Sequence, residues 1–249
     1  MINIWKRPLE VGLLCGVLAL ISAPAMATPI VGTLQLGGTF TVTGTALQFC
    51  DTAGPCAAAP GNWNPPGNGT LDLAAPYAND PNGGLITNLN NVNAPVGTTL
   101  AGNGLLFLTF NVSGALPVPD IEFYLKQLFA GVFTSVDCGA APAPGQTCTP
   151  PGSAVSFVNG AGGTSSASIS MTGLARRIST NEFDNLSMVL TSQFTTPYQT
   201  VLAMLQSQGS VTNTWSGTFT ATAVPEPLTI SLLGLGLVGL GLFRRRAVR

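Results

Sequence analysis

Strict alternation between hydroxyl-bearing and other side chains constrains this fold more than any other feature of the sequence. Between Val211 and Ala221, every second residue is threonine or serine, and most of the residues between them are apolar. Residues 33–43 and 166–172 repeat the pattern. Because successive side chains of a β-strand point to opposite faces, this alternation predicts half-buried strands of antiparallel sheets.

Other segments fit the same architecture. Residues 105–112 begin with a run that is apolar on both faces, as in a central strand, and residues 186–194 alternate again. Residues 120–129 are ambiguous, because their apolar residues alternate while Glu122 and Lys126 have the spacing of a helical ion pair. We favour a strand there. Clusters of Gly, Pro and Asn separate the predicted strands at residues 59–69, 79–84, 93–104 and 139–152.

One helix is predicted near the end of the domain. Thr196 to Gln199 has the pattern of a capping box with Pro197 at the first helical position, and Gly209 is a typical C-terminal cap. The apolar residues between these caps have helical spacing and are Tyr198, Val201, Leu202 and Leu205. We therefore predict a mainly β fold, an antiparallel, jelly-roll-like β-sandwich of about eight to ten strands with one short helix.

The N-terminus has the three parts of a secretory signal peptide. Lys6 and Arg7 form a basic region, and residues 11–21 form an apolar run of about eleven residues, which is too short to span a bilayer. Ala25 and Ala27 then occupy the small-residue positions of a cleavage site. We predict that signal peptidase removes residues 1–27. The alternative is an uncleaved anchor helix.

The C-terminus has the pattern of a single membrane-spanning helix followed by a stop signal. Residues 228–243 form a glycine-rich apolar run of about 16 residues, which is roughly 24 Å as a helix. Arg244, Arg245 and Arg246 follow it and are expected to stay in the cytoplasm. The sequence thus predicts an exported domain at residues 28–223 and a sorting and anchor segment at residues 224–249.

The C-terminal segment resembles a known sorting signal. Pro225, Glu226 and Pro227 precede the short Gly/Leu-rich helix and the arginine cluster, which is the order of parts in PEP-CTERM proteins. That resemblance implies a Gram-negative bacterium that makes extracellular polysaccharide. It also implies recognition of the motif by an exosortase, which releases or transfers the protein to the cell surface or the medium. The alternative is an ordinary single-span anchor with a proline-rich neck.

The charge of the exported domain excludes one class of partner, and its cysteine content suggests disulfide bonds. Residues 28–223 contain three basic and eight acidic side chains, a net charge of about −5, so no nucleic-acid partner is expected. Four cysteines remain after removal of Cys15. In an oxidising compartment we favour two local disulfides, because each pair brackets a turn-rich loop: Cys50 with Cys56, and Cys138 with Cys148. A four-thiolate metal site is the alternative.

The sequence lacks a recognisable catalytic or cofactor site. The chain has no histidine, which removes the usual nucleophile–histidine machinery and histidine-ligated metals. Two carboxylate pairs have i, i+2 spacing and would suit an acid-pair glycan hydrolase: Asp120 with Glu122, and Glu182 with Asp184. Residues 79–83 and 181–185 gather oxygen ligands that would suit calcium, although Asx turns explain both segments more simply. We expect no enzyme activity and no cofactor.

Sugar binding is the sharpest hypothesis for the exported domain. Trp63 and Tyr77, in a segment rich in Asn, Gly and Pro, would offer an aromatic platform with amide hydrogen bonds. Asn68, Asn111 and Asn185 match the N-glycosylation pattern, which we attribute to chance. Our first hypothesis is a non-enzymatic, exported surface or matrix protein that an exosortase sorts. The second is a carbohydrate-binding module for extracellular polysaccharide, and the third is a hydrolase.

Overall fold

The structure is a computed structural model and describes residues 28–50, 56, 61–74, 84–110, 120–224 and 236, with residues 61–67 described through their backbone. The predicted signal peptide, the Pro225-Glu226-Pro227 motif, the arginine cluster, Tyr77, Asn111 and residues 79–83 lie outside this part of the chain. The Trp63 side chain also lies outside it. The domain boundaries therefore stay predictions.

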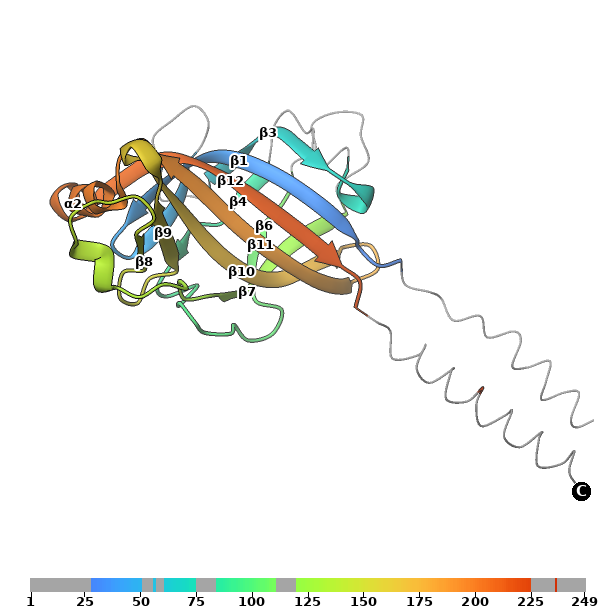
Figure 1. The fold of residues 1–249 in the computed structure, drawn as a ribbon. Helices are drawn as coiled ribbons and strands as arrows, with labels where there is room; N and C mark the ends of the chain where they lie inside the picture. The colour runs from blue at the N-terminus through green and yellow to red at the C-terminus, as the bar shows by residue number, and fades with distance from the viewer. Residues whose placement is uncertain are drawn as a thin grey trace, which may run out of the picture.

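The described residues form a mainly β domain with one α-helix (Figure 1). The strands are β1 Gly32–Thr43, β2 Ala46–Cys50, β3 Gly61–Gly69, β4 Gly84–Ile86, β5 Leu89–Asn90, β6 Leu105–Leu108, β7 Ile121–Leu128, β8 Thr147–Cys148, β9 Val155–Asn159, β10 Ser165–Arg177, β11 Glu182–Phe194 and β12 Ser210–Thr222. The helix α2 spans Tyr198–Gln208, and short 3₁₀ turns span Leu71–Leu73, Val136–Gly139 and Ala161–Gly163. The predicted strand at residues 120–129 is confirmed by β7.

The strands belong to one antiparallel sheet that curls around its own core. Its order is β11-β12-β1-β3-β4-β6-β7-β10-β9-β8, and β10 also pairs with β11, which closes a ring of strands. The link between β4 and β6 consists of one residue pair, Ile86 with Leu108. The long, twisted strands β1, β10, β11 and β12 form the continuous wall seen in Figure 1.

The predicted two-sheet sandwich is therefore corrected to a single curled sheet. The mainly β, antiparallel character and the one helix are confirmed. The difference has a physical origin, because a long strand with a strong twist can bury one face inside a sheet that curls on itself. Alternation reports which side of each strand is buried, and it is the same in a sandwich and in a curled sheet.

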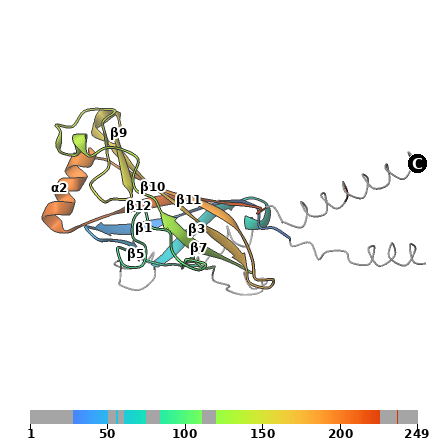
Figure 2. The same ribbon diagram turned by 90° about the horizontal axis from the view of Figure 1, so that it is seen from below.

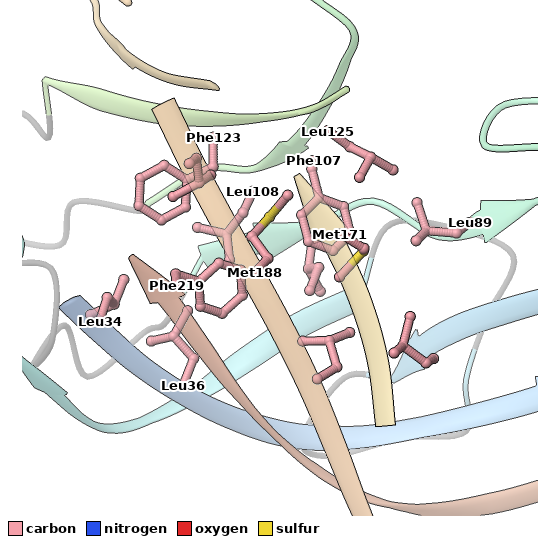
Figure 3. Packing of buried hydrophobic residues seen from close by; sticks show 14 of the residues in the cluster. Leu34, Leu36, Leu89, Phe107, Leu108, Phe123, Leu125, Met171, Met188 and Phe219 are labelled. Atoms are coloured by element: carbon pink, nitrogen blue, oxygen red, sulfur yellow. The ribbon is translucent and has the colours of Figure 1, made fainter. Parts of the chain in front are cut away.

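The core fills the inside of the curl. Most inward residues of β10 and β12 are buried, those at the start of β12 are partly buried, and the outward ones are partly or fully exposed, which confirms the alternation. Figure 3 shows apolar side chains from several strands converging, among them Phe107, Phe123, Met188 and Phe219. The Phe123 and Phe219 rings stack with centroids 5.8 Å apart. Such burial supplies most of the favourable free energy of folding.

A second, smaller core lies under α2. It contains Cys148, Phe157, Ala167, Tyr198 and Val201. Figure 2 shows α2 at the end of the sheet opposite to the chain ends of the described domain. Gly209 ends the helix with φ = 75°, in the left-handed region that favours glycine, as predicted.

The predicted capping box at the start of α2 is wrong. Pro197 is the N-cap residue and offers no side-chain cap. Instead, the side chain of Asn159 on β9 accepts a hydrogen bond from the Tyr198 N–H at 3.0 Å. Gln199 belongs to the same hydrogen-bond network. Its side chain accepts a hydrogen bond from Asn159 Nδ2 at 2.9 Å and donates one to the Gln146 side chain at 2.9 Å. The cap therefore comes from a distant strand.

Two disulfides fasten loops to the sheet. Cys50 is bonded to Cys56, and Cys138 is bonded to Cys148, with sequence separations of 6 and 10. These are the two pairings that the sequence favoured. The first lies beside β1, where the Thr41 hydroxyl contacts Cys56 Sγ at 2.9 Å. The second joins the loop before β8 to the small core under α2.

Candidate functional site: the end of the sheet where the chain enters and leaves

The chain enters and leaves the domain at one end of the sheet, here called the entry end. β1 pairs with β12 antiparallel, with Gly32 opposite Ala221, and β11 continues the sheet with Asn185 opposite Thr222. The first described residues and the last ones before the sorting segment therefore lie side by side (Figure 1). Residues 30–31, Asp72, Asp184 and Val224 define this end.

Asp184 joins both chain ends through one carboxylate. Its Oδ2 accepts a hydrogen bond from the Ile30 N–H at 2.6 Å, and its Oδ1 accepts one from the Val224 N–H at 3.0 Å. Asp184 is only 5% exposed, and Ile30 beside it is fully buried. A buried carboxylate is stable only when its oxygens are well bonded, so these contacts are what allow Asp184 to lie there.

A second carboxylate holds only the incoming chain. Asp72 Oδ2 accepts a hydrogen bond from the Val31 N–H at 2.9 Å. Two residues further along, the Thr33 N–H donates to the Thr70 hydroxyl at 3.0 Å. Asp72 and Asp184 thus make the same kind of bond to neighbouring residues, but of these two, Asp184 is the one bonded to Val224.

A cluster of polar and aromatic side chains lies on the outer surface near the entry end. We call Glu122, Tyr124, Arg176, Asn181 and Phe183 the Arg176 cluster. Arg176 Nη1 donates to Glu122 and to the Tyr124 hydroxyl, each at 3.3 Å, and its Nε donates to Asn181 at 3.0 Å. The guanidinium carbon lies 5.8 Å from the centre of the Phe183 ring.

The electrostatics of this cluster keep its cation charged. The hydrogen bond to Tyr124 raises the pKa of Arg176 above its ordinary value, and the nearby Glu122 carboxylate acts in the same direction. The Tyr124 hydroxyl in turn donates to Glu122 at 3.0 Å. The Tyr124 and Phe183 rings are 6.2 Å apart with their planes at 63°, so two half-buried aromatic rings flank a neutralised ion pair.

A field of uncharged hydroxyl groups adjoins this cluster. Most outward positions of β10, β11, β12 and β1 carry serine or threonine, with a few glutamines, one asparagine and the apolar Leu174 and Val189 among them, and we call the serine and threonine positions the hydroxyl face. One row across the four strands runs Thr172, Ser187, Thr220 and Thr33, and another begins with Ser168, Thr191 and Ser216. Thr191 and Ser216 hydrogen-bond through their hydroxyls at 3.0 Å. This face presents hydrogen-bonding groups without net charge.

The carboxylates predicted as acid pairs each have separate partners. Asp120 accepts bonds from the Ser179 N–H and hydroxyl and lies 3.8 Å from Arg177. Glu182 accepts from the Thr180 hydroxyl at 2.7 Å. Glu122 belongs to the Arg176 cluster, and Asp184 binds the chain ends. In the described part of the chain, no three His, Cys, Asp or Glu residues are placed to hold a metal ion.

An apolar cavity of about 40 Å³ lies between α2 and the inside of the sheet. Its walls come from both cores and include Phe40, Leu190, Phe157 and Val201. The volume leaves room for a few small atoms only. The cavity lies at the interface between α2 and the curled sheet.

Comparison with known protein families identifies the segment that follows the last strand of the sheet. β12 stops at Thr222, and residues 223–246 match the family described as the PEP-CTERM protein-sorting motif. The chain therefore carries this motif, which confirms the resemblance seen in the sequence and implies exosortase-dependent sorting of an exported protein. Comparison with curated proteins found no match, and neither did comparison with solved structures. No helix within the described residues has both the length and the apolar character needed to cross a bilayer.

The sequence predicted the sorting motif but not the hydrogen bond between Asp184 and Val224, the residue before Pro225. Asp184 was considered only as an acid-pair or calcium candidate. A usable signal existed, because Asp184 shares the inward face of β11 with Leu186 and Met188, and a carboxylate in that position needs buried partners. The Arg176 cluster joins strands that are far apart in sequence, which no local pattern reveals.

Proposed function

We propose that this protein is a non-enzymatic surface or matrix protein that is exported, anchored for a time in the inner membrane and then released by an exosortase. The observation that carries the proposal is the junction between fold and motif. The match to the sorting motif begins at residue 223, one residue after β12 ends at Thr222. The folded domain is therefore the cargo of the motif, with no spacer between them.

The route assigns a role to each end of the chain. Signal peptidase would cut after Ala27 and leave Thr28 as the first residue. The apolar segment after Pro227 would hold the protein in the membrane, with Arg244, Arg245 and Arg246 on the cytoplasmic side. Both membrane-directed segments join the domain at its entry end, so the domain is able to fold outside while either end is still attached.

The absence of enzyme activity is part of the proposal. Among the described carboxylates once considered as acid pairs, Glu122 is bonded to a cation and Asp184 to two backbone amides. Both oxygens of Asp184 are bonded, and Oε2 of Glu122 is bonded to Arg176 and Tyr124, whereas a general acid or nucleophile has to contact the substrate. A panel of glycans should therefore show no hydrolysis, and activity that disappears in Glu122→Gln would contradict this part of the proposal.

The mass of the protein in its native host tests the sorting route. We expect a membrane form with the tail and a released form that begins at Thr28 and ends near Pro227. Glu226→Ala should leave the protein in the membrane fraction, because the exosortase would lose its recognition motif. Glu182→Ala is the matched control, since it removes a carboxylate on the folded domain. A tail that is never removed from the wild-type protein would sink the proposal.

We infer a second candidate function, saccharide binding, from the Arg176 cluster and the hydroxyl face. Aromatic rings pack against the apolar faces of sugars, and paired charged groups bind their hydroxyls. The sequence pointed instead to Trp63 and Tyr77, which the described side chains do not include. Retention on the host's extracellular polysaccharide should fall in Phe183→Ala and not in Leu106→Ala, an exposed apolar control. Equal retention of both variants would argue against this site, and loss in Trp63→Ala would favour the other.

A further inference from the structure

We propose that Asp184 is a positioning residue for the sorting reaction, because its carboxylate holds Val224 on the sheet and so slows cleavage at the motif beside it. This inference rests on the proposed sorting by an exosortase. Pro225 follows Val224 directly, so the Asp184–Val224 hydrogen bond at 3.0 Å lies one residue from the recognition motif.

The bond is stronger than an ordinary surface contact. Its acceptor is a carboxylate that is 5% exposed, and charge-assisted bonds of this kind exceed neutral ones. The second oxygen of the same carboxylate binds the Ile30 N–H at 2.6 Å. Asp184 is itself almost fully buried, and hydrogen bonds in such a poorly hydrated environment are electrostatically stronger than in water.

Cleavage needs this hold to be released. Proteases act on chain segments that are locally open, and when opening is fast the rate follows the population of the open form. An enzyme that recognises Pro225 to Pro227 also needs space around the preceding residues. Here Val224, the residue before Pro225, is hydrogen-bonded to Asp184 on β11. The Asp184–Val224 bond therefore lowers the open population, and loss of the bond should raise it about tenfold.

The test follows release of the full-length protein in its native host. After a pulse of labelled amino acid, the half-time for conversion of the anchored form to the released form is measured. Asp184→Ala removes both bonds and should shorten the half-time about tenfold. Asp72→Ala is the matched control: it removes the same kind of bond from Val31 and does not touch Val224. It should release at the wild-type rate.

An insertion variant distinguishes the effect of the Asp184–Val224 bond from a general loosening of the domain. Gly-Ser-Gly-Ser placed between Val224 and Pro225 leaves the domain unchanged and gives the enzyme free chain before the motif. Release should be as fast as in Asp184→Ala, and adding Asp184→Ala to the insertion should change nothing further. This variant also decides the matter if Asp184→Ala does not fold.

The outcomes distinguish the two proposals. If the wild-type protein is released and the insertion variant has the same release half-time, the proposed role of Asp184 is wrong. Equal acceleration by Asp72→Ala and Asp184→Ala would also overturn it, because loosening of the N-terminal segment would then be sufficient. If the wild-type protein is never cleaved, the sorting proposal itself is wrong.

Discussion

The two ends of the curled sheet are held together by different chemistry. At the entry end, carboxylates bind backbone amides and arginines, as in the contacts of Asp184 and Arg176. At the other end, which we call the helix end, neutral amides do the same work. Asn159 binds the start of α2 and links to Gln146 and Gln199.

This difference matches what each end has to do. A neutral amide network has fixed partners and responds little to salt or to pH in the physiological range, which suits a permanent joint. The helix end adds a disulfide, Cys138–Cys148, and a fully buried Tyr198. The entry end instead holds a chain segment next to a motif that another enzyme must reach. Stability should therefore be concentrated at the helix end, and the predictions below test that contrast.

The largest loss of stability is expected for Tyr198→Ala. The ring is fully buried in the small core and its hydroxyl donates to the Asp137 carbonyl at 3.0 Å. Removing it leaves a cavity and takes from the Asp137 carbonyl one of its two hydrogen bonds, the other being from the Ala140 N–H, and this should lower the free energy of unfolding by about 3–5 kcal/mol. Denaturant unfolding of the purified domain measures this. A loss below about 1 kcal/mol would mean that α2 contributes little to the fold.

The next largest effect is expected from removing the disulfide at the helix end. Replacing both Cys138 and Cys148 with serine opens a loop with a sequence separation of 10 and should cost about 2–3 kcal/mol. Hydrogen exchange should then increase in α2 and β8 and stay unchanged around β1. The same replacement at Cys50 and Cys56 is the control, and it should leave α2 protected. Because Cys56 contacts Thr41, which pairs with Thr212 near the helix end, equal exchange of α2 in both variants would mean that the Cys138–Cys148 bond has no particular role in holding α2.

Local patterns were sufficient to predict the helix and six of the described strands, namely β1, β6, β7, β10, β11 and β12. The last strand was expected at residues 211–221 and is Ser210–Thr222, because alternation and burial agree along its whole length. The sequence did not reveal the ring of pairings. Alternation carries no information on which strands are neighbours, and the ring depends on long-range pairings such as β1 with β12 and β7 with β10. Five short strands were missed, since each is too brief to show a clear period: β2, β4, β5, β8 and β9. The expectation that residues 59–69 only separate strands was wrong, because Gly61–Gly69 forms β3 although its Gly, Pro and Asn content is typical of a loop.

The candidate site was less predictable than the fold. The sorting motif is contiguous, so Pro225 to Pro227 could be recognised from the sequence. The partners of Asp184 are 154 and 40 residues away, and those of Arg176 lie on three strands or turns. Asn159, which caps α2, is 39 residues from Tyr198. Long-range hydrogen bonds of this kind leave only one local trace, a polar residue at an inward position.

A smaller effect is expected for Tyr198→Phe, which also tests the response of the helix end to alkali. The ring stays and one hydrogen bond is lost, so the cost near neutral pH should be about 1 kcal/mol. Burial raises the pKa of Tyr198 above 10.0 in the folded state. The unfolded chain therefore loses this proton first, and the wild-type protein should lose stability as the pH rises past about 10. Thermal melts should show a weaker decline in Tyr198→Phe, and parallel declines would refute the assignment.

The smallest effect is expected at the Arg176 cluster, and its salt dependence distinguishes the two ends. Arg176→Gln removes the ion pair with Glu122, whose side chain is 20% exposed while that of Arg176 is 28% exposed. Pairs that water reaches contribute little to stability, because solvent screens them. The change in melting temperature should be smaller than for Tyr198→Phe and should vanish in about 1 M salt, where the Debye length falls to about 3 Å. Asn159→Ala at the helix end should be destabilising at both salt concentrations, because an uncharged cap is not screened. A salt-independent loss in Arg176→Gln would mean that the cluster packs as part of the core, and the contrast between a polar entry end and a fixed helix end would then not hold.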